Sequence, residues 1–184
     1  AAIAKKHKLI VVEDCAQAFG ARGDTFKIGE LSDAVATSFI TAKNLGCFGD
    51  GGALLTNRED IHKRCEALRN HGSYKRSHHS YGFNSRLDEL QAAMLRVKLK
   101  YLNEWNERRV QLAEQYLAKL ANTPLVLPLV TDGADPAWHL FVVRCLERDL
   151  LQAHLKKRGI ETLIHYPIPP HLQPAYQELG MPEG

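Results

Sequence analysis

The sequence predicts an α/β fold, and three features of the 184-residue chain support this prediction. Residues 9–12, LIVV, form a continuous aliphatic run of the kind found in strands that are buried on both faces. Two further strand-like runs, AVATSFI at 34–40 and ALLT at 53–56, precede a helical pattern at 58–70. A helical period then extends from residue 87 to residue 120. This mixture of strands and helices is typical of α/β domains.

Residues 1–85 are predicted to form part of this α/β domain. Glu13 and Asp14 follow the first strand, which we expect to be parallel, so an acid lies at its carboxyl end. Ligands bind at that end of the strands in open α/β sheets. The third strand is entered through the turn GDGG, and Asn57 is expected to cap the helix that follows it. The polar and aromatic residues 71–85 predict a loop.

Residues 86–121 are predicted to form one long connecting helix, because apolar side chains recur at helical spacing. These side chains are Leu87, Leu90, Met94, Val97, Tyr101, Trp105, Leu112, Tyr116 and Leu120. We expect this apolar stripe to be either core or dimer surface. It is not interpreted as a cofactor site.

Residues 122–184 are predicted to form part of a smaller α+β domain. The pattern predicts a strand at 139–145, a helix over 148–160 that ends near Gly159, and a strand at 161–170 that runs into a proline-rich turn. The chain begins without Met, inside a helical pattern, and stops on a turn-like segment. We therefore expect it to be a fragment of a longer protein.

Composition excludes several classes of function. The net charge is +3 and the basic residues are scattered, so nucleic-acid binding is not indicated. No apolar run approaches the roughly 20 residues that a membrane helix needs. The four cysteines have no CxxC spacing, which argues against a zinc ribbon or a disulfide scaffold and fits a reducing, cytoplasmic location. His78 and His79 are adjacent and lack an obvious third ligand, so no metal site is predicted.

The segment SFITAKNLGCFGDGG at 38–52 carries the candidate chemistry, because Lys43 lies between a strand and a glycine-rich loop. A desolvated lysine near positive charge has a lowered pKa and becomes nucleophilic toward an aldehyde. Pyridoxal phosphate (PLP) needs such a lysine, an acid for its ring nitrogen and a ligand for its phosphate. Lys43, Asp14 and Ser38 can fill these roles in turn. Taken singly, each feature also fits an ordinary cap, surface lysine or hairpin turn, which leaves the function open.

Five segments, taken together, resemble one family. They are VVEDCAQAFGA, SFITAKNLGCFGDGGALLTN, LRNHGS, GFNSRLDELQAAMLRVKL and IHYPIPPHLQPAY, and they cover nearly the whole chain in this order. The set resembles the DegT/DnrJ/EryC1/StrS family of PLP-dependent sugar aminotransferases. The resemblance implies the fold of aspartate aminotransferase. Residues 1–85 would then be the C-terminal half of the large, mixed-sheet PLP-binding domain, and residues 122–184 part of the small C-terminal α+β domain.

The resemblance also implies roles for individual residues. Lys43 would form the imine with PLP and move a proton between substrate and cofactor. Asp14 would pair with the pyridine nitrogen, and Gln17 would lie beside the cofactor ring. Ser38 would bind the phosphate. Asn84 would reach the phosphate of the neighbouring subunit, which implies a homodimer with shared active sites.

The same resemblance places His165, Tyr166 and His171, in HYPIPPH, near the sugar nucleotide. A rigid turn at YPIPP and a solvated His171 are the other interpretations. Because Lys43 is present, amino transfer is expected rather than the sugar dehydration catalysed by family members with histidine there. The expected substrates are glutamate as donor and a nucleotide-linked keto sugar, with a dTDP-3-keto-6-deoxyhexose preferred. The rival interpretation is a non-catalytic regulatory or dimerising module.

Two departures from the family pattern affect these expectations. The family's N-terminal part, which stacks on the cofactor and binds its phosphate, has no counterpart here, and the final segment also has none. We therefore expect the 184 residues alone neither to bind PLP tightly nor to turn over. FITA also stands where an aromatic-proline pair is expected before the lysine.

Overall fold

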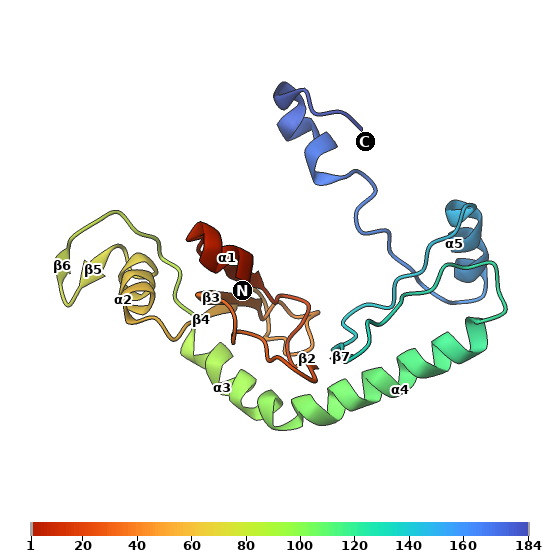
Figure 1. Ribbon diagram of the computed structural model, residues 1–184, viewed down its shortest axis with the longest axis horizontal. Helices are drawn as coiled ribbons and strands as arrows, with labels where there is room; N and C mark the ends of the chain where they lie inside the picture. The colour runs from red at the N-terminus through yellow and green to blue at the C-terminus, as the bar shows by residue number, and fades with distance from the viewer. Residues whose placement is uncertain (1, 184) are drawn as a thin grey trace. The chain divides into compact units, whose positions relative to one another are not determined.

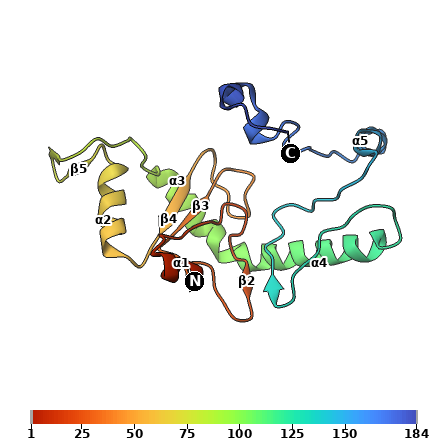
Figure 2. The same ribbon diagram turned by 45° about the horizontal axis from the view of Figure 1, so that its top comes forward.

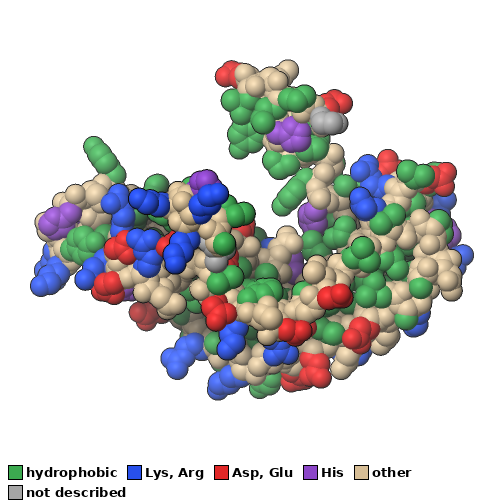
Figure 3. All heavy atoms as spheres, in the orientation of Figure 1, with side chains coloured by type: hydrophobic (Ala, Val, Ile, Leu, Met, Phe, Trp, Pro, Cys, Tyr) green, Lys and Arg blue, Asp and Glu red, His purple; other side chains and the backbone are tan. Residues whose placement is uncertain are grey.

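The computed structural model describes residues 2–183, and the chain divides into two compact units. The first unit contains Ala1–Thr123 and Leu127–Val143, and the second contains Pro124–Val126 and Arg144–Gly184. Figure 1 shows the elements of each unit in chain order. No helix in the described part of the chain is both long and apolar enough to cross a bilayer. On the face seen in Figure 3, acidic and basic side chains are interspersed.

A three-stranded mixed sheet lies in the first unit. Its order is β1 (Val12–Asp14), β3 (Ala34–Ser38) and β4 (Gly52–Leu55). β1 pairs with β3 in parallel, and β3 pairs with β4 antiparallel, so that β3 and β4 lie side by side in Figure 2. The parallel first strand and the two later strands are confirmed, the one expected at 34–40 ending earlier, at Ser38, and the one expected at 53–56 shifted by one residue to 52–55.

The first strand begins later than the aliphatic run predicted. Residues 9–12 are only partly in the sheet, because the N–H of Leu9 bonds the carbonyl of Ala4, in helix α1 (Ala2–His7), at 2.9 Å. The N–H of Val11 bonds the Asp33 side chain instead of a neighbouring strand, at 2.8 Å. The start of the run therefore completes the C-terminal end of α1, and only Val12 belongs to the sheet.

The register of the sheet places alternate side chains on opposite faces. Asp14 is paired with Ala36, and Ala36 with Leu54. Ser38 stands two residues beyond Ala36 on the same strand and is paired with Gly52. Asp14, Ala36, Leu54 and Ser38 therefore share one face, which we call the Asp14 face.

Helix α2 (Glu59–Leu68) follows β4, and its N-cap is Arg58 with extended backbone and no side-chain cap bond. The expectation that Asn57 caps this helix is wrong. Thr56 Oγ1 instead accepts the N–H of Arg58, at 3.0 Å, one residue earlier than predicted. Glu59 and Asp60 in the first turn place negative charge at the helix N-terminus, where the helix dipole favours it.

Part of the segment predicted as a loop after α2 forms a short antiparallel hairpin, β5 (Ser73–Tyr74) with β6 (Ser77–His78). A second two-stranded pair joins β2 (Arg22–Gly23) to β7 (Ala134–Asp135), with Arg22 Nε at 2.8 Å from Asp135 Oδ2.

The predicted long helix is a continuous path of three elements: α3 (Glu89–Lys98), the 3-10 turn η1 (Leu99–Tyr101) and α4 (Leu102–Leu120). Its buried residues are Leu95, Leu102 and Ala113. Leu95 and Leu102 form the core with Leu45 and Cys47, against which Phe19, Phe39 and Leu87 pack.

Most of the apolar stripe predicted on this helix lies outside that core. Its exposed members are Leu90, Met94, Val97, Tyr101, Trp105, Leu112 and Tyr116. For these residues the interpretation as core of this chain is wrong, because the buried helix face is a different one. The other interpretation, a dimer surface, stays a prediction.

In the second unit, helix α5 (Arg148–Lys157) confirms the predicted helix, and Gly159 follows it with φ +76°, as a left-handed residue after a helix end. The unit ends with the 3-10 turns η2 (Pro170–Leu172) and η3 (Pro174–Leu179). The strands predicted at 139–145 and 161–170 are wrong. The first makes one isolated bridge, Val126 with Arg144, and the second contains three prolines without N–H donors.

Candidate active site

The candidate site begins where β1 and β3 end. Asp14 is the last residue of β1 and Ser38 is the last residue of β3. Both lie on the Asp14 face, and Ser38 is two residues beyond Ala36, the register partner of Asp14. Two residues along a strand span roughly 6.6 Å. The parallel pairing thus brings an acid and a hydroxyl to the same edge and the same face of the sheet.

Local hydrogen bonds orient the side chains of Asp14 and Ser38 and leave each with one further hydrogen-bonding group. Asp14 Oδ1 accepts the N–H of Ala16 at 3.0 Å, and its other oxygen has no donor among the described residues. Ser38 Oγ accepts the N–H of Ile40 at 3.3 Å, so its own hydrogen stays available to an acceptor. Asp14 is exposed and Ser38 half-buried. A carboxylate oxygen and a hydroxyl donor are therefore free to bind a ligand.

Lys43 lies in a tightly closed loop between β3 and β4. Phe39 closes the loop, because its N–H donates to Gly51 at 2.7 Å and its carbonyl accepts from Cys47 at 2.7 Å. The N–H of Lys43 donates to the carbonyl of Ile40 at 2.9 Å. Lys43 is half-buried between exposed Ala42 and buried Asn44. The loop therefore holds the lysine backbone in a defined turn.

Gly46 has a steric role in this loop. A Cβ at Gly46 would overlap the carbonyl oxygen of Thr41, so no larger residue fits without moving the backbone. This close approach explains one of the four glycines in residues 46–52.

Cys15 directly follows Asp14, at the carboxyl end of β1, and is buried. Burial, and then the negative charges of Glu13 and Asp14, raise the pKa of its thiol, so it stays protonated near neutral pH. Its carbonyl accepts the Thr37 hydroxyl at 3.4 Å. Cys15 is therefore a packing residue at this edge.

The other predicted cofactor residues, Gln17 and Asn84, lie apart from Lys43 in their contacts. Gln17 is exposed in the turn in which the N–H of Ala18 donates to the carbonyl of Cys15 at 3.1 Å. Asn84 is exposed and its backbone bridges to Asn70 after α2. Among the described residues no hydrogen bond joins either side chain to Asp14, Ser38 or Lys43. Their roles stay predictions.

The predicted substrate residues all belong to the second unit. His165 and Tyr166 are exposed, with ring centroids 5.4 Å apart and an edge-on geometry. His171 is half-buried in η2. Their role in binding a sugar nucleotide also stays a prediction.

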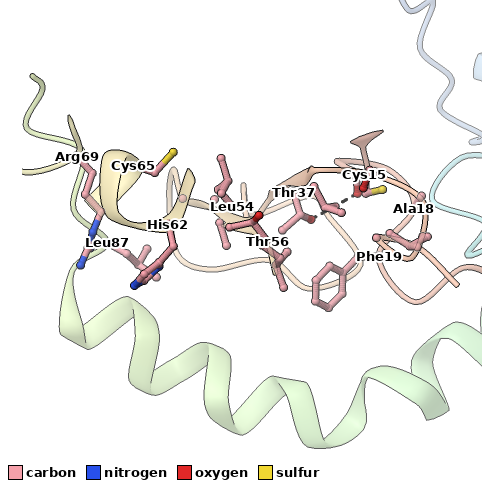
Figure 4. Close-up of a pocket in the computed structure, with 18 of the residues that line it drawn as sticks. Cys15, Ala18, Phe19, Thr37, Leu54, Thr56, His62, Cys65, Arg69 and Leu87 are labelled. Carbon is pink, nitrogen blue, oxygen red and sulfur yellow. Dashed lines mark hydrogen bonds between the residues drawn. The ribbon is translucent and has the colours of Figure 1, made fainter. Parts of the chain in front are cut away.

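A large hollow in the first unit has Asn84, one of the predicted cofactor residues, in its lining (Figure 4). Phe19, Thr37, His62 and Leu87 are among the residues that line it, and Thr37 lies on the face of β3 opposite to Ser38. Asp14, Ser38 and Lys43 do not line it. The described residues also contain no group of three or more histidine, cysteine or acidic side chains that could hold a metal ion. Of the predicted cofactor residues, Asn84 thus lies in the hollow, whereas Asp14, Ser38 and Lys43 lie at the strand ends and in the loop after β3.

Solved structures show which fold this is. The crystal structure of DesV from S. venezuelae in complex with a ketimine intermediate matches with a TM-score of 0.95 and 52% identity, covering 100% of this chain and 50% of that one. NtdA from Bacillus subtilis with bound cofactor PMP matches with a TM-score of 0.83 and 34% identity, covering 96% and 42%. The chain has the α/β fold of PLP-dependent transferases of the aspartate-aminotransferase type, which confirms the predicted fold class.

The sequence comparisons identify the family. The profile of the DegT/DnrJ/EryC1/StrS aminotransferase family matches residues 1–183, and the chain belongs to this family. Erythromycin biosynthesis sensory transduction protein EryC1 of Saccharopolyspora erythraea is 53% identical, over 100% of this chain and 50% of the relative. The dTDP-3-amino-3,4,6-trideoxy-alpha-D-glucose transaminase of Streptomyces venezuelae is 52% identical, over 99% and 48%. The chain thus spans about half the length of these relatives.

The groups at the sheet edge fit PLP in their chemistry. A carboxylate with a free oxygen suits the pyridinium N–H, a hydroxyl with a free hydrogen suits the phosphate, and a lysine amine suits the aldehyde. Asp14, Ser38 and Lys43 supply these three groups on adjoining segments.

Sequence reasoning missed the residues that hold the lysine loop. Asn44 and Asn106 form a hydrogen bond at 2.8 Å although they are 62 positions apart. The only signal was a polar residue, Asn106, four positions after Leu102 on the helix face that turns out to be buried.

Proposed function

We propose that this chain carries the lysine-bearing part of a PLP-dependent aminotransferase that moves an amino group from glutamate to a nucleotide-linked keto sugar. The observation that carries the proposal is the meeting of Asp14 and Ser38 at one sheet edge, directly before the loop that presents Lys43. A relative that is 52% identical, named dTDP-3-amino-3,6-dideoxy-alpha-D-galactopyranose transaminase, supports a dTDP-3-keto-6-deoxyhexose as the sugar. A relative that is 33% identical, the 3-oxo-glucose-6-phosphate:glutamate aminotransferase of Bacillus subtilis, supports glutamate as the donor.

Each residue has a defined task in this proposal. Bound PLP supplies the electron sink that stabilises negative charge at the substrate carbon. The Asp14 carboxylate accepts the hydrogen bond of the ring N–H and keeps the ring cationic. Ser38 donates to the phosphate, and Gln17 lies beside the ring. Lys43 Nζ binds the cofactor and moves the proton at the substrate carbon.

The remaining predicted site residues are proposed to serve a neighbouring subunit or the sugar nucleotide. Asn84 serves the site of a second subunit in a homodimer, and its exposed side chain is available for this. His165, Tyr166 and His171 contact the sugar nucleotide. A cytoplasmic location is proposed because all four cysteines are free, as in a reducing compartment.

The test is reduction with borohydride in the presence of PLP, followed by peptide mass mapping. In the full-length gene product that carries this chain, one phosphopyridoxyl group should appear on Lys43. The variant Lys43→Ala should lose the label and amino transfer, whereas Lys119→Ala, which removes an exposed lysine in the last turn of α4, should retain both. Normal amino transfer by Lys43→Ala would overturn the proposal.

A non-catalytic regulatory or dimerising module is the second candidate. The observation that favours it is the name of EryC1, a sensory transduction protein, for a relative 53% identical to this chain. The two candidates differ in absorbance. An aminotransferase reconstituted with PLP absorbs in the visible range through Lys43, and a module without cofactor does not. A colourless protein whose dimer mass is unchanged by Lys43→Ala would favour the module.

A further inference from the structure

We propose that Asn106, on helix α4, is a positioning residue that fixes Lys43 through Asn44. It ties the lysine loop, residues 39–51, to the loop between β1 and β2, residues 15–21, which we call the Asp14 loop. The inference rests on the proposed role of Lys43 as the cofactor lysine. Asn106 does not touch the reacting groups. It acts on them through the backbone of two loops.

Asn44 directly follows Lys43, and two hydrogen bonds hold its side chain. Asn44 is 7% exposed, so its side chain is shielded from water. A primary amide has two N–H donors, and both are used. One donates to Asn106 Oδ1 and the other to the carbonyl of Ala137, each at 2.8 Å. With both donors engaged, the orientation of Asn44 is set, and with it the backbone next to Lys43.

The nitrogen of the Asn106 amide binds the Asp14 loop. Asn106 Nδ2 donates to the carbonyl of Phe19 at 3.1 Å, in the segment that follows Asp14 and Gln17. The next residue, Gly20, has φ +91°, and a Cβ there would overlap Asn106 Nδ2. The Asp14 loop therefore approaches Asn106 more closely than any other residue type at position 20 would allow.

One amide group thus bonds two loops at once. Its oxygen accepts from Asn44, beside Lys43, and its nitrogen donates to Phe19, beyond Asp14. The separation between the amine that binds the cofactor aldehyde and the acid that binds the ring nitrogen depends on both loops. Asn106 is half-buried on a rigid helix, so it provides a common reference point for them.

Two more side chains of the same helix face hold the lysine loop farther from Lys43. Gln91 binds both backbone groups of Phe48, accepting from its N–H at 2.8 Å and donating to its carbonyl at 2.7 Å. Lys98 Nζ donates to the carbonyl of Gly46. Positions 91, 98 and 106 recur on one face of the helical path. Only Asn106 reaches the residue adjacent to Lys43 and also the Asp14 loop.

The consequence is geometric. Without the Asn106 amide, Asn44 keeps one bond to Ala137, and the carbonyl of Phe19 loses its partner. Both loops can then shift independently. A misplacement of about 1 Å can cost on the order of 100-fold in rate. The cofactor amine is then less well aligned with the ring acid, although the substrate-binding residues are untouched.

The experiment compares Asn106→Ala with Asn103→Ala in the full-length gene product. Asn103 is an exposed asparagine on the same helix, so it controls for the loss of an amide from α4. Three quantities are measured: borohydride labelling of Lys43 with PLP, the pH dependence of visible absorbance, and kcat and KM. For Asn106→Ala we expect labelling slowed roughly tenfold, a shifted absorbance midpoint and a fall in kcat larger than the change in KM. Asn103→Ala should match the parent protein.

A third variant, Asn106→Asp, separates the bond to Asn44 from the bond to Phe19. It also serves as the test if Asn106→Ala does not fold. It keeps an oxygen for Asn44 but turns a second oxygen, which repels the carbonyl of Phe19, toward the Asp14 loop. Only the Asp14 loop then loses its bond, so Lys43 labelling should stay closer to the parent than that of Asn106→Ala. When the alanine variant is unfolded, Asn106→Asp should still shift the absorbance midpoint. If the Asn106 variants show the same labelling and absorbance as Asn103→Ala, this inference is overturned and the proposed function is not. No Lys43 label in the parent would overturn the proposed function, and this inference with it.

Discussion

Asp33 and Arg58 are joined by a hydrogen-bonded ion pair, with Asp33 Oδ1 at 2.8 Å from Arg58 Nη1. The same carboxylate accepts the N–H of Val11 at 2.8 Å through its other oxygen. Asp33 therefore connects the residue before β1 with the N-cap of α2, two elements far apart in sequence. Arg58 also binds Asp60 at 2.6 Å, which completes a three-member charge network.

This network predicts a loss of stability in acid. The Val11 N–H first, and then Arg58, hold the pKa of Asp33 below its ordinary value of 3.8. A group with a lowered native pKa stabilises the fold above its unfolded pKa, and that contribution disappears as the pH falls through the native value. Thermal unfolding measured between pH 6 and pH 2 should show that Asp33→Asn lowers the melting temperature at pH 6 and makes it less dependent on pH below 4. Parallel curves for parent and variant would contradict this.

Asp14→Asn should reduce amino transfer while leaving the fold intact. The amide can still accept the N–H of Ala16 but has no negative charge to pair with a pyridinium. Removal of one such electrostatic contact typically costs roughly 100-fold to 1,000-fold in kcat. Steady-state kinetics of the full-length gene product test this. Asp132→Asn, at an exposed acid outside the site, should keep full activity.

Gly46→Ala should disrupt the lysine loop. The added methyl group meets the carbonyl oxygen of Thr41, so the backbone near Lys43 must move. Gly159→Ala is the matched control, since its Cβ meets no atom within 4 Å and it carries only the strain of φ +76°, about 1–2 kcal/mol. Chemical denaturation should show a larger loss of stability for Gly46→Ala, and only this variant should lose Lys43 labelling. Equal losses of both would refute the assigned contact.

Val97→Glu should weaken the proposed homodimer. Val97 is 57% exposed within the apolar stripe of α3 and α4, where Tyr101 and Trp105 stack with centroids 6.0 Å apart. If a second copy covers this stripe, a buried glutamate should raise the dissociation constant by more than roughly tenfold. Analytical ultracentrifugation measures the change. Glu107→Lys, at an exposed position on another side of α4, should remain dimeric, and a dimeric Val97→Glu would exclude the stripe as the interface.

Local patterns predicted the elements of the fold that depend on nearby residues. β3, β4, α2 and α5 appear close to their predicted positions because aliphatic runs and helical periods act over a few residues. The strands expected at 139–145 and 161–170 failed because a strand needs a partner, and residues 139–145 find only the Val126–Arg144 bridge. Strand identity is thus a property of the pairing rather than of the segment.

Only some residues of the candidate site could be predicted from the sequence. Asp14 and Ser38 could be placed at strand ends, since the aliphatic runs before them are local signals. The Asn44–Asn106 pair could not, because 62 residues separate its members and neither carries a charge or belongs to a recognisable motif. The exposed apolar stripe shows the same limit. Helical spacing revealed that one face is apolar but not which face the core would use.

The chain separations at the sheet edge also set an order of folding events. Ser38 and Gly52 pair across the lysine loop alone, whereas Asp14 must find Ala36 and Asn44 must find Asn106 over longer stretches. Closing a short loop costs less chain entropy, so the hairpin around Lys43 is expected to form early and its attachment to α4 late. A late contact chiefly retards unfolding. The amide of Asn106 would then act as a latch on a hairpin that is already made, determining how long the assembled edge persists rather than how fast it forms.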